Sequence, residues 1–103
     1  MNLIDNNIEK IVELCEKHKV RELYIFGSIL TDKFNNYSDI DMLIQFNNVE
    51  LLDYFDNYMD LKEELEFIFQ RSIDLVENQA IRNPIFRKII DREKQLIYER
   101  KSA

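Results

Sequence analysis

The chain has very little of several residue types that often carry chemistry: among its 103 residues are one glycine, one cysteine, one histidine and no tryptophan. A single cysteine, Cys15, excludes an internal disulfide and favours a reducing cytoplasm. A single histidine, His18, argues against a Ser-His-Asp triad. One glycine also excludes a Walker A loop, which needs two.

Long apolar runs and an excess of basic residues are absent as well. No stretch approaches the ~20 apolar residues that span a bilayer, and residues 1–7 lack the charge and apolar pattern of a signal peptide, so we expect no membrane association. The chain has 20 acidic and 14 basic residues, a net charge of −6. Nucleic-acid binders usually carry the opposite balance, so we expect no direct nucleic-acid binding. An acidic chain suits bound cations or a basic partner, although −6 is also an ordinary charge for solubility.

The remaining pattern predicts one α/β (α+β) domain over residues 1–103, with a small mixed sheet of about three to four strands flanked by helices. The apolar fraction of 46% is enough for a core. Apolar spacing and turn residues give the element boundaries. Helices are expected at 4–18, at 50–69 after an Asn47-Asn48 cap, and from Asn83-Pro84 to 92; strands at 20–26, 39–46, 72–76 and 95–98; and a solvated tail at 99–103.

Three aspartates lie on expected strands among apolar neighbours. Side chains alternate between the two faces of a strand, so Asp39 and Asp41 share one face. The other face is entirely apolar and carries Ile40, Met42, Ile44 and Phe46. Asp74 alternates in the same way with Ile73 and Leu75. If the two strands are neighbours, the three carboxylates converge on the face away from the core.

Such convergence favours a bound cation. Two carboxylates ~5 Å apart repel by roughly 3 kcal/mol at an effective dielectric constant near 20. Hard oxygen ligands without His or Cys suit Mg²⁺, or Mn²⁺, better than Zn²⁺. Two such ions would stabilise the attacking and leaving oxygens of a nucleotidyl transfer. An isolated Asp-x-Asp is also compatible with a role in capping a turn.

Gly27 and Ser28 follow the first expected strand directly. A glycine here lets the backbone approach a phosphate, and Ser28 at the start of a helical turn can donate to phosphate oxygens. The alternative is a plain strand-to-helix turn with Ser28 as its N-cap.

Gly27-Ser28, followed after ten residues by Asp39-Ile40-Asp41, resembles the Gly-Ser…Asp-x-Asp signature of the DNA polymerase beta-like nucleotidyltransferase superfamily. The stretch from Asp74 to Asn83-Pro84 resembles its minimal nucleotidyltransferase (MNT) branch. The resemblance covers residues 20–98.

The resemblance implies a nucleotidyltransferase-like fold and a role for each motif residue. It implies that Asp39, Asp41 and Asp74 bind two Mg²⁺ ions, with Asp74 also a general base, and that Gly27 and Ser28 hold the triphosphate of ATP. Stand-alone proteins of this size resemble antitoxins of HEPN/MNT toxin–antitoxin pairs, which transfer AMP to a tyrosine of a HEPN ribonuclease.

The chain departs from the family in one place. Members commonly carry Arg and Gly shortly after Gly-Ser, whereas this chain reads Ile29-Leu30-Thr31-Asp32-Lys33. We expect Lys33 either to supply the missing positive charge to the nucleotide or to be solvated.

Two surfaces leave alternatives open. The long helix has more apolar residues than one core face needs, and the surplus would suit contact with a partner protein or with a second copy of the chain. The basic residues of the last helix form either a solvated face or a contact with phosphate or a partner; they are Arg82, Arg87, Lys88 and Arg92. A binding module that neutralises its partner without catalysis is therefore the alternative to an enzyme, and transfer to a small molecule or to RNA is a third reading.

Overall fold

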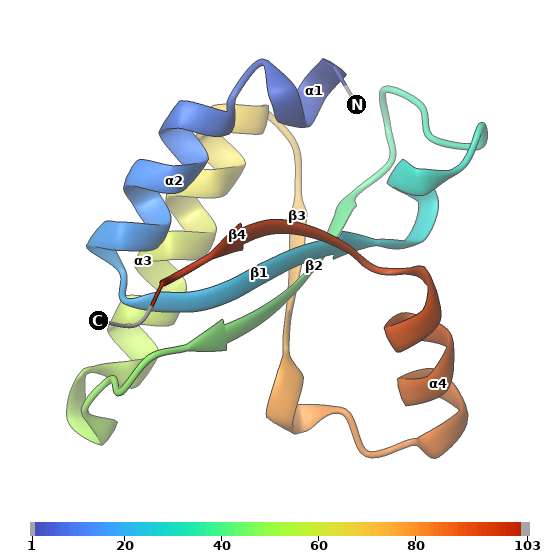
Figure 1. Cartoon of the computed structure of the whole chain (residues 1–103). Coiled ribbons are helices and arrows are strands. Elements are labelled where there is room, and N and C mark those ends of the chain that lie inside the picture. The colour runs from blue at the N-terminus through green and yellow to red at the C-terminus, as the bar shows by residue number, and fades with distance from the viewer. Residues whose placement is uncertain (1, 102–103) are drawn as a thin grey trace.

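The computed structural model describes residues 2–101 and consists of a mixed four-stranded sheet with helices on both faces (Figure 1). In chain order the elements are α1 (Asn2–Asp5), α2 (Ile8–Lys17), β1 (Val20–Phe26), the 3₁₀ turn η1 (Gly27–Leu30), β2 (Ile40–Phe46), α3 (Leu51–Phe69), β3 (Ile73–Glu77), the 3₁₀ turn η2 (Asn78–Ala80), α4 (Pro84–Glu93) and β4 (Gln95–Glu99).

The strand order is β3-β2-β1-β4. β1 pairs antiparallel with both β2 and β4, whereas β2 and β3 are parallel. A parallel pair needs a long crossover, and α3 supplies it. The expected mixed sheet flanked by helices is therefore confirmed. The second and third strands are neighbours, which is the condition under which the aspartates were expected to converge.

Alternation along the strands builds a core on each face of the sheet. The larger core lies under α2 and α3 and contains Leu23, Met42 and Leu75 among its buried residues. The smaller one joins Phe26 and Leu43 of the opposite face to Ile90 of α4. In Figure 1, α2 and α3 lie together to one side of the sheet and α4 lies to the other.

The N-terminal half differs from the expected pattern in two places. The single helix expected at 4–18 is broken into α1 and α2, and the side chain of Asn7 at the break donates to the carbonyl of Leu3. The expected Asn47-Asn48 cap is wrong, because α3 begins after Glu50 without a side-chain cap. Asn48 instead turns the chain with a positive φ of 53°.

The C-terminal half follows expectation more closely. Asn83 caps α4 as predicted, with Oδ1 accepting from the backbone N–H groups of Ile85 and Phe86. The predicted solvated tail is wrong at its start, because β4 extends to Glu99 and Arg100 donates to the carbonyls of Val20 and Cys15. Residues 102–103 of that tail lie outside the described residues. No helix in the described part of the chain is both long and apolar enough to cross a bilayer.

Candidate active site

The parallel register of β2 and β3 places Asp41 directly beside Asp74. Both side chains lie on the sheet face that carries α4, because Phe26, the register partner of Asp41 on β1, belongs to the core beneath that helix. Asp39 precedes the first residue of β2 and is exposed. The alternation argument thus holds for Asp41 and Asp74, while Asp39 belongs to the preceding loop.

Negative charge accumulates at this point. Burial raises the pKa of Asp41 above its usual 3.8, and the charges of Asp74 and Asp39 raise it further. A hydrogen bond with Asp74 acts in the same direction. The negative charges of these neighbouring carboxyl groups form a site that a bound cation would stabilise.

Within residues 2–101, no three His, Cys, Asp or Glu side chains are arranged so that they could hold one metal ion. The chain by itself therefore offers a pair of carboxylates with a third nearby. That donor set fits Mg²⁺, which is usually bound through one or two carboxylates together with water and substrate phosphates.

Gly27, the first residue after β1, lies against Asp41 of this pair. Its φ is +78°, and a Cβ at this position would overlap Oδ2 of Asp41. The backbone thus bends sharply against the carboxylate, and a glycine is needed for both reasons. The sequence predicts that this glycine lets the backbone approach a phosphate. In the structure it also makes room for the side chain of Asp41.

Ser28 lies in the 3₁₀ turn that begins at Gly27 and is partly exposed. Its carbonyl accepts hydrogen bonds from both the backbone N–H and the hydroxyl of Thr31, at 2.9 and 2.8 Å. The turn is therefore held by Thr31, the residue that follows it. Since Gly27 follows the register partner of Asp41, the turn begins at the carboxylate pair.

Lys33 lies in the exposed loop after this turn. Its backbone N–H donates to the Thr31 hydroxyl and its carbonyl accepts from Asn35. Among the described residues, no hydrogen bond or ion pair joins its side chain to the three aspartates.

Sequence reasoning missed Arg71, which lies two residues before the start of β3, the strand of Asp74. Its Nη1 donates to the carbonyls of Asn35 and Ser38 at 3.0 and 2.9 Å, and its guanidinium lies 4.6 Å from the centre of the Phe34 ring. Arg71 thus ties the loop that ends at Asp39 to the start of β3. The only sequence signal was its position just before Ser72.

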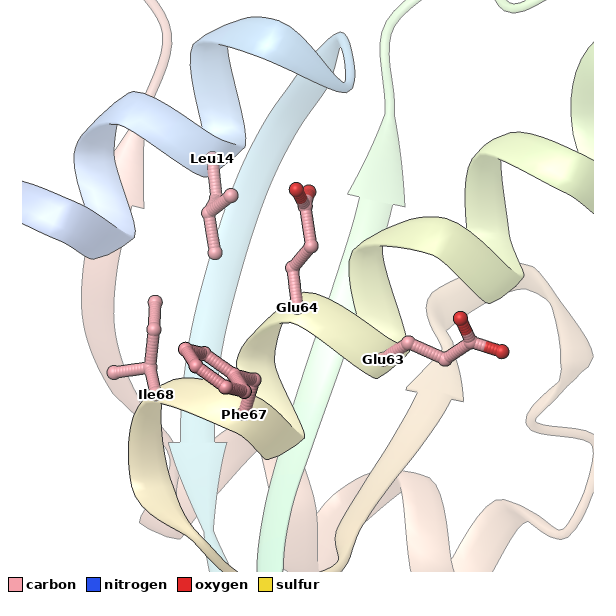
Figure 2. A pocket seen from close by; sticks show the side chains of 5 residues that line it. All are labelled: Leu14, Glu63, Glu64, Phe67 and Ile68. Carbon is pink, nitrogen blue, oxygen red and sulfur yellow. The ribbon is translucent and has the colours of Figure 1, made fainter.

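A separate pocket lies between α2 and α3, on the other side of the sheet. Figure 2 shows its lining: Leu14 faces Phe67 and Ile68 across the gap, with Glu63 and Glu64 beside them. It contains none of the three aspartates.

Comparison with known proteins gives consistent results. The sequence profile of the family described as polymerase beta, nucleotidyltransferase, matches residues 9–103. A Methanocaldococcus jannaschii protein that carries the name protein adenylyltransferase on a provisional basis is 39% identical over 85 residues, covering 82% of each chain. Protein adenylyltransferase MntA of Thermococcus cleftensis is 30% identical over 78 residues, covering 76% of each chain.

Solved structures share the fold. A protein provisionally described as a minimal nucleotidyltransferase superposes with a TM-score of 0.74 at 26% identity, over 92% of this chain and 95% of that one. A chain from a toxin–antitoxin structure with AMP-PNP gives 0.68 at 18% identity, over 92% and 75%. A chain from a complex of a tri-AMPylated Shewanella oneidensis HEPN toxin with its MNT antitoxin gives 0.63 at 19%, over 94% and 73%.

Proposed function

The chain belongs to the polymerase beta nucleotidyltransferase family, and from this premise we propose that it transfers AMP from ATP to a tyrosine hydroxyl of a HEPN-type ribonuclease and so acts as its antitoxin. The observation that carries the proposal is the Asp41–Asp74 pair against the Gly27-Ser28 turn. The names of its relatives and the complexes among its structural neighbours support it.

Asp41 and Asp74, with Asp39 from the loop, are the residues that would hold Mg²⁺ or Mn²⁺. When bound, the cation supplies positive charge that stabilises the oxygens around the reacting phosphorus. A bound cation would favour the ionised form of Asp41, because it opposes the burial and the charges of Asp74 and Asp39 that raise the pKa of this group.

The chain's own groups would bind and orient the nucleotide. The backbone N–H groups and the hydroxyl at Gly27-Ser28 donate to triphosphate oxygens, and Lys33 adds positive charge from the loop. In the transfer, the tyrosine oxygen forms a bond to the α-phosphorus while the bond from that phosphorus to the β-bridging oxygen breaks. Asp74 accepts the tyrosine proton, and pyrophosphate leaves.

A second candidate is a binding module that neutralises its partner without catalysis. It is favoured by the missing Arg-Gly after Ser28 and by the apolar residues that α3 leaves in solvent, where Leu51, Leu52 and Phe55 are 88%, 95% and 71% exposed. Such a patch is typical of a surface that contacts another protein.

The test is a transfer assay in lysate of the source cells, with Mg²⁺ and ATP labelled on the α-phosphate. Wild type should label a protein band, and ATP labelled on the γ-phosphate should not. Asp41→Asn and Asp74→Asn should lower labelling at least 100-fold, whereas Asp56→Asn, at an exposed acidic position on α3, should not. Labelling at the wild-type rate by both site variants would overturn the mechanism.

The second candidate predicts a different result. An Asp39→Asn/Asp41→Asn/Asp74→Asn variant that still inhibits the purified ribonuclease at a one-to-one ratio would establish neutralisation by binding. Inhibition that needs wild-type protein, ATP and Mg²⁺ would establish neutralisation by AMP transfer.

A further inference from the structure

The outer surface of α4 combines apolar and basic side chains in one stripe. Ile85 and Ile89 are four residues apart, as are Lys88 and Arg92, and Lys88 is three residues after Ile85, so the four side chains share a face of the helix. Ile85 and Ile89 are 70% and 40% exposed, and Lys88 and Arg92 are also exposed. We call these four residues the α4 stripe.

The inner side of the same helix packs on the sheet face that carries the carboxylates. Ile90 is buried against Phe26 and Leu43, and the ring of Phe86 lies edge-on to that of Phe26 with centroids 6.3 Å apart. Phe26 is the register partner of Asp41. A macromolecule whose side chain reaches Asp41 and Asp74 from this face therefore meets α4, which covers the same face of the sheet in Figure 1.

The stripe is basic in a chain that is otherwise acidic. Residues 82–94 contain five basic and two acidic residues, against a net charge of −6 for the whole chain. Arg87 and Lys94 are engaged internally, by Asn78 and Asp91 respectively. Within residues 2–101, Arg82 and Lys88 are exposed and have no ion-pair partner, whereas Arg92 of the stripe lies 3.5 Å from Glu93.

We infer that the α4 stripe is the docking surface for the protein that receives the nucleotide, and that this protein presents an acidic and apolar surface beside its acceptor hydroxyl. The choice of partner rests on the proposed function. The position of the docking surface and the chemistry of the partner's surface rest on the contacts and charges described above. Basic charge steers an acidic partner towards the site, and Ile85 and Ile89 bury apolar area once it is bound.

Other occupants fit less well. A nucleic acid would meet the acidic charge of the remaining chain and would leave Ile85 and Ile89 without apolar contacts. A second copy would have to place its own acidic surface on the stripe and would then block the approach to Asp41 and Asp74.

The experiment uses the full chain and a purified HEPN-type ribonuclease from the same organism. Ile85→Glu/Ile89→Glu removes the apolar contacts, and Lys88→Glu/Arg92→Glu reverses the charge. Leu52→Glu/Phe55→Glu is the control, with two apolar residues on α3 that are 95% and 71% exposed. Binding is measured by calorimetry at low and high salt. AMP-PNP affinity with Mg²⁺ and circular dichroism check that each variant retains its fold and its nucleotide site.

Both α4 variants should bind the ribonuclease at least 10-fold more weakly, with nucleotide affinity unchanged, and the charge-reversal variant should lose most at low salt. The α3 control should bind as wild type does. The inference would be overturned if the α4 variants bound the ribonuclease as wild type does. It would also be overturned if only the α3 control lost binding, or if wild type did not bind. Stripe-dependent binding of a single-stranded RNA or stripe-dependent self-association would overturn it as well.

The proposed function is tested separately in the same samples. Stripe-dependent binding without AMP transfer by wild type would contradict the proposed activity and leave the docking surface standing. AMP transfer at the wild-type rate by both α4 variants would contradict the docking surface and leave the activity standing.

Discussion

The carboxyl group of Asp41 occupies the space that a side chain on Gly27 would need. Gly27 also has a φ of +78°, in the left-handed region that costs other residues roughly 1–2 kcal/mol. The glycine therefore meets two independent requirements, one of the backbone and one of its neighbour on β2.

Gly27→Ala should lower both stability and transfer. We expect a loss of about 2–4 kcal/mol in the free energy of unfolding, measured in urea, because backbone strain and a clash with Asp41 add. Transfer should fall at least 100-fold, since the carboxylate must move to admit the methyl group.

A double-mutant cycle separates the two causes. In an Asp41→Ala background, Gly27→Ala should cost only the strain of about 1–2 kcal/mol. An equal cost in both backgrounds would show that Asp41 and Gly27 are energetically independent.

Asp41→Asn should make the cation-free protein more stable at neutral pH. Because the pKa of this carboxyl group is raised in the folded protein, the folded state binds more protons than the unfolded state at pH values between the two pKa values. The stability of wild type therefore falls as pH rises from about 3.8 through the pKa of the folded state. The asparagine variant lacks this loss. We expect it to exceed wild type in stability at pH 7 in urea unfolding with EDTA, and the difference to shrink towards pH 4.

The same two proteins are also compared in the presence of Mg²⁺. Added Mg²⁺ should stabilise wild type more than Asp41→Asn, because the ion binds the ionised pair in the folded state. Wild-type stability that does not depend on pH between 4 and 7 would contradict the charge accumulation at Asp41.

Arg71→Met should loosen the loop that leads to Asp39. The variant loses the bonds to the carbonyls of Asn35 and Ser38, for which we expect about 1–3 kcal/mol of destabilisation. Hydrogen exchange at residues 35–39 should accelerate. Arg71→Lys is the control: it keeps the charge but lacks the planar guanidinium, so it should restore only part of the protection. Unchanged exchange in the methionine variant would show that other contacts hold the loop.

Sequence patterns were most informative where each residue's neighbours in the chain decide its environment. Apart from Arg21 and Glu22, residues 20–26 are apolar, β-branched or aromatic up to Gly27, and they form the expected strand. Alternation placed Asp41 and Asp74 on the outer face because Met42 and Leu75 must be buried.

Register and loop contacts lay beyond such patterns, because they depend on residues far apart in the chain. The register of β2 and β3 places Asp41 beside Asp74. Contacts with the end of α3 and with Ser72 hold this register. Arg71 reaches a loop 33 to 36 residues away. Asparagine is a residue type that often caps helices, but the positive φ of Asn48 places it in the turn before α3.

Glu66 near the end of α3 holds the first residue of β3 and thereby sets this register. Its Oε2 accepts from the backbone N–H of Ile73 and from Lys62, each at 3.0 Å. The hydrogen bond from Ile73, and then Lys62, lower the pKa of Glu66 below its usual 4.5. Ile73 is the register partner of Ile40, one residue before the Asp41–Asp74 pair.

Glu66→Gln should therefore destabilise the protein by about 1 kcal/mol at pH 7, because a hydrogen bond to a charged acceptor is replaced by one to a neutral amide. A depressed pKa contributes stability that is present above 4.5 and lost as pH falls through the folded value, so wild type and variant should converge in urea unfolding near pH 3. This dependence is opposite in sign to that at Asp41. Glu63→Gln, at an exposed position on the same helix, should differ from wild type by less than about 0.5 kcal/mol. If Glu66→Gln matched that control at pH 7, the start of β3 would be held by its backbone contacts alone.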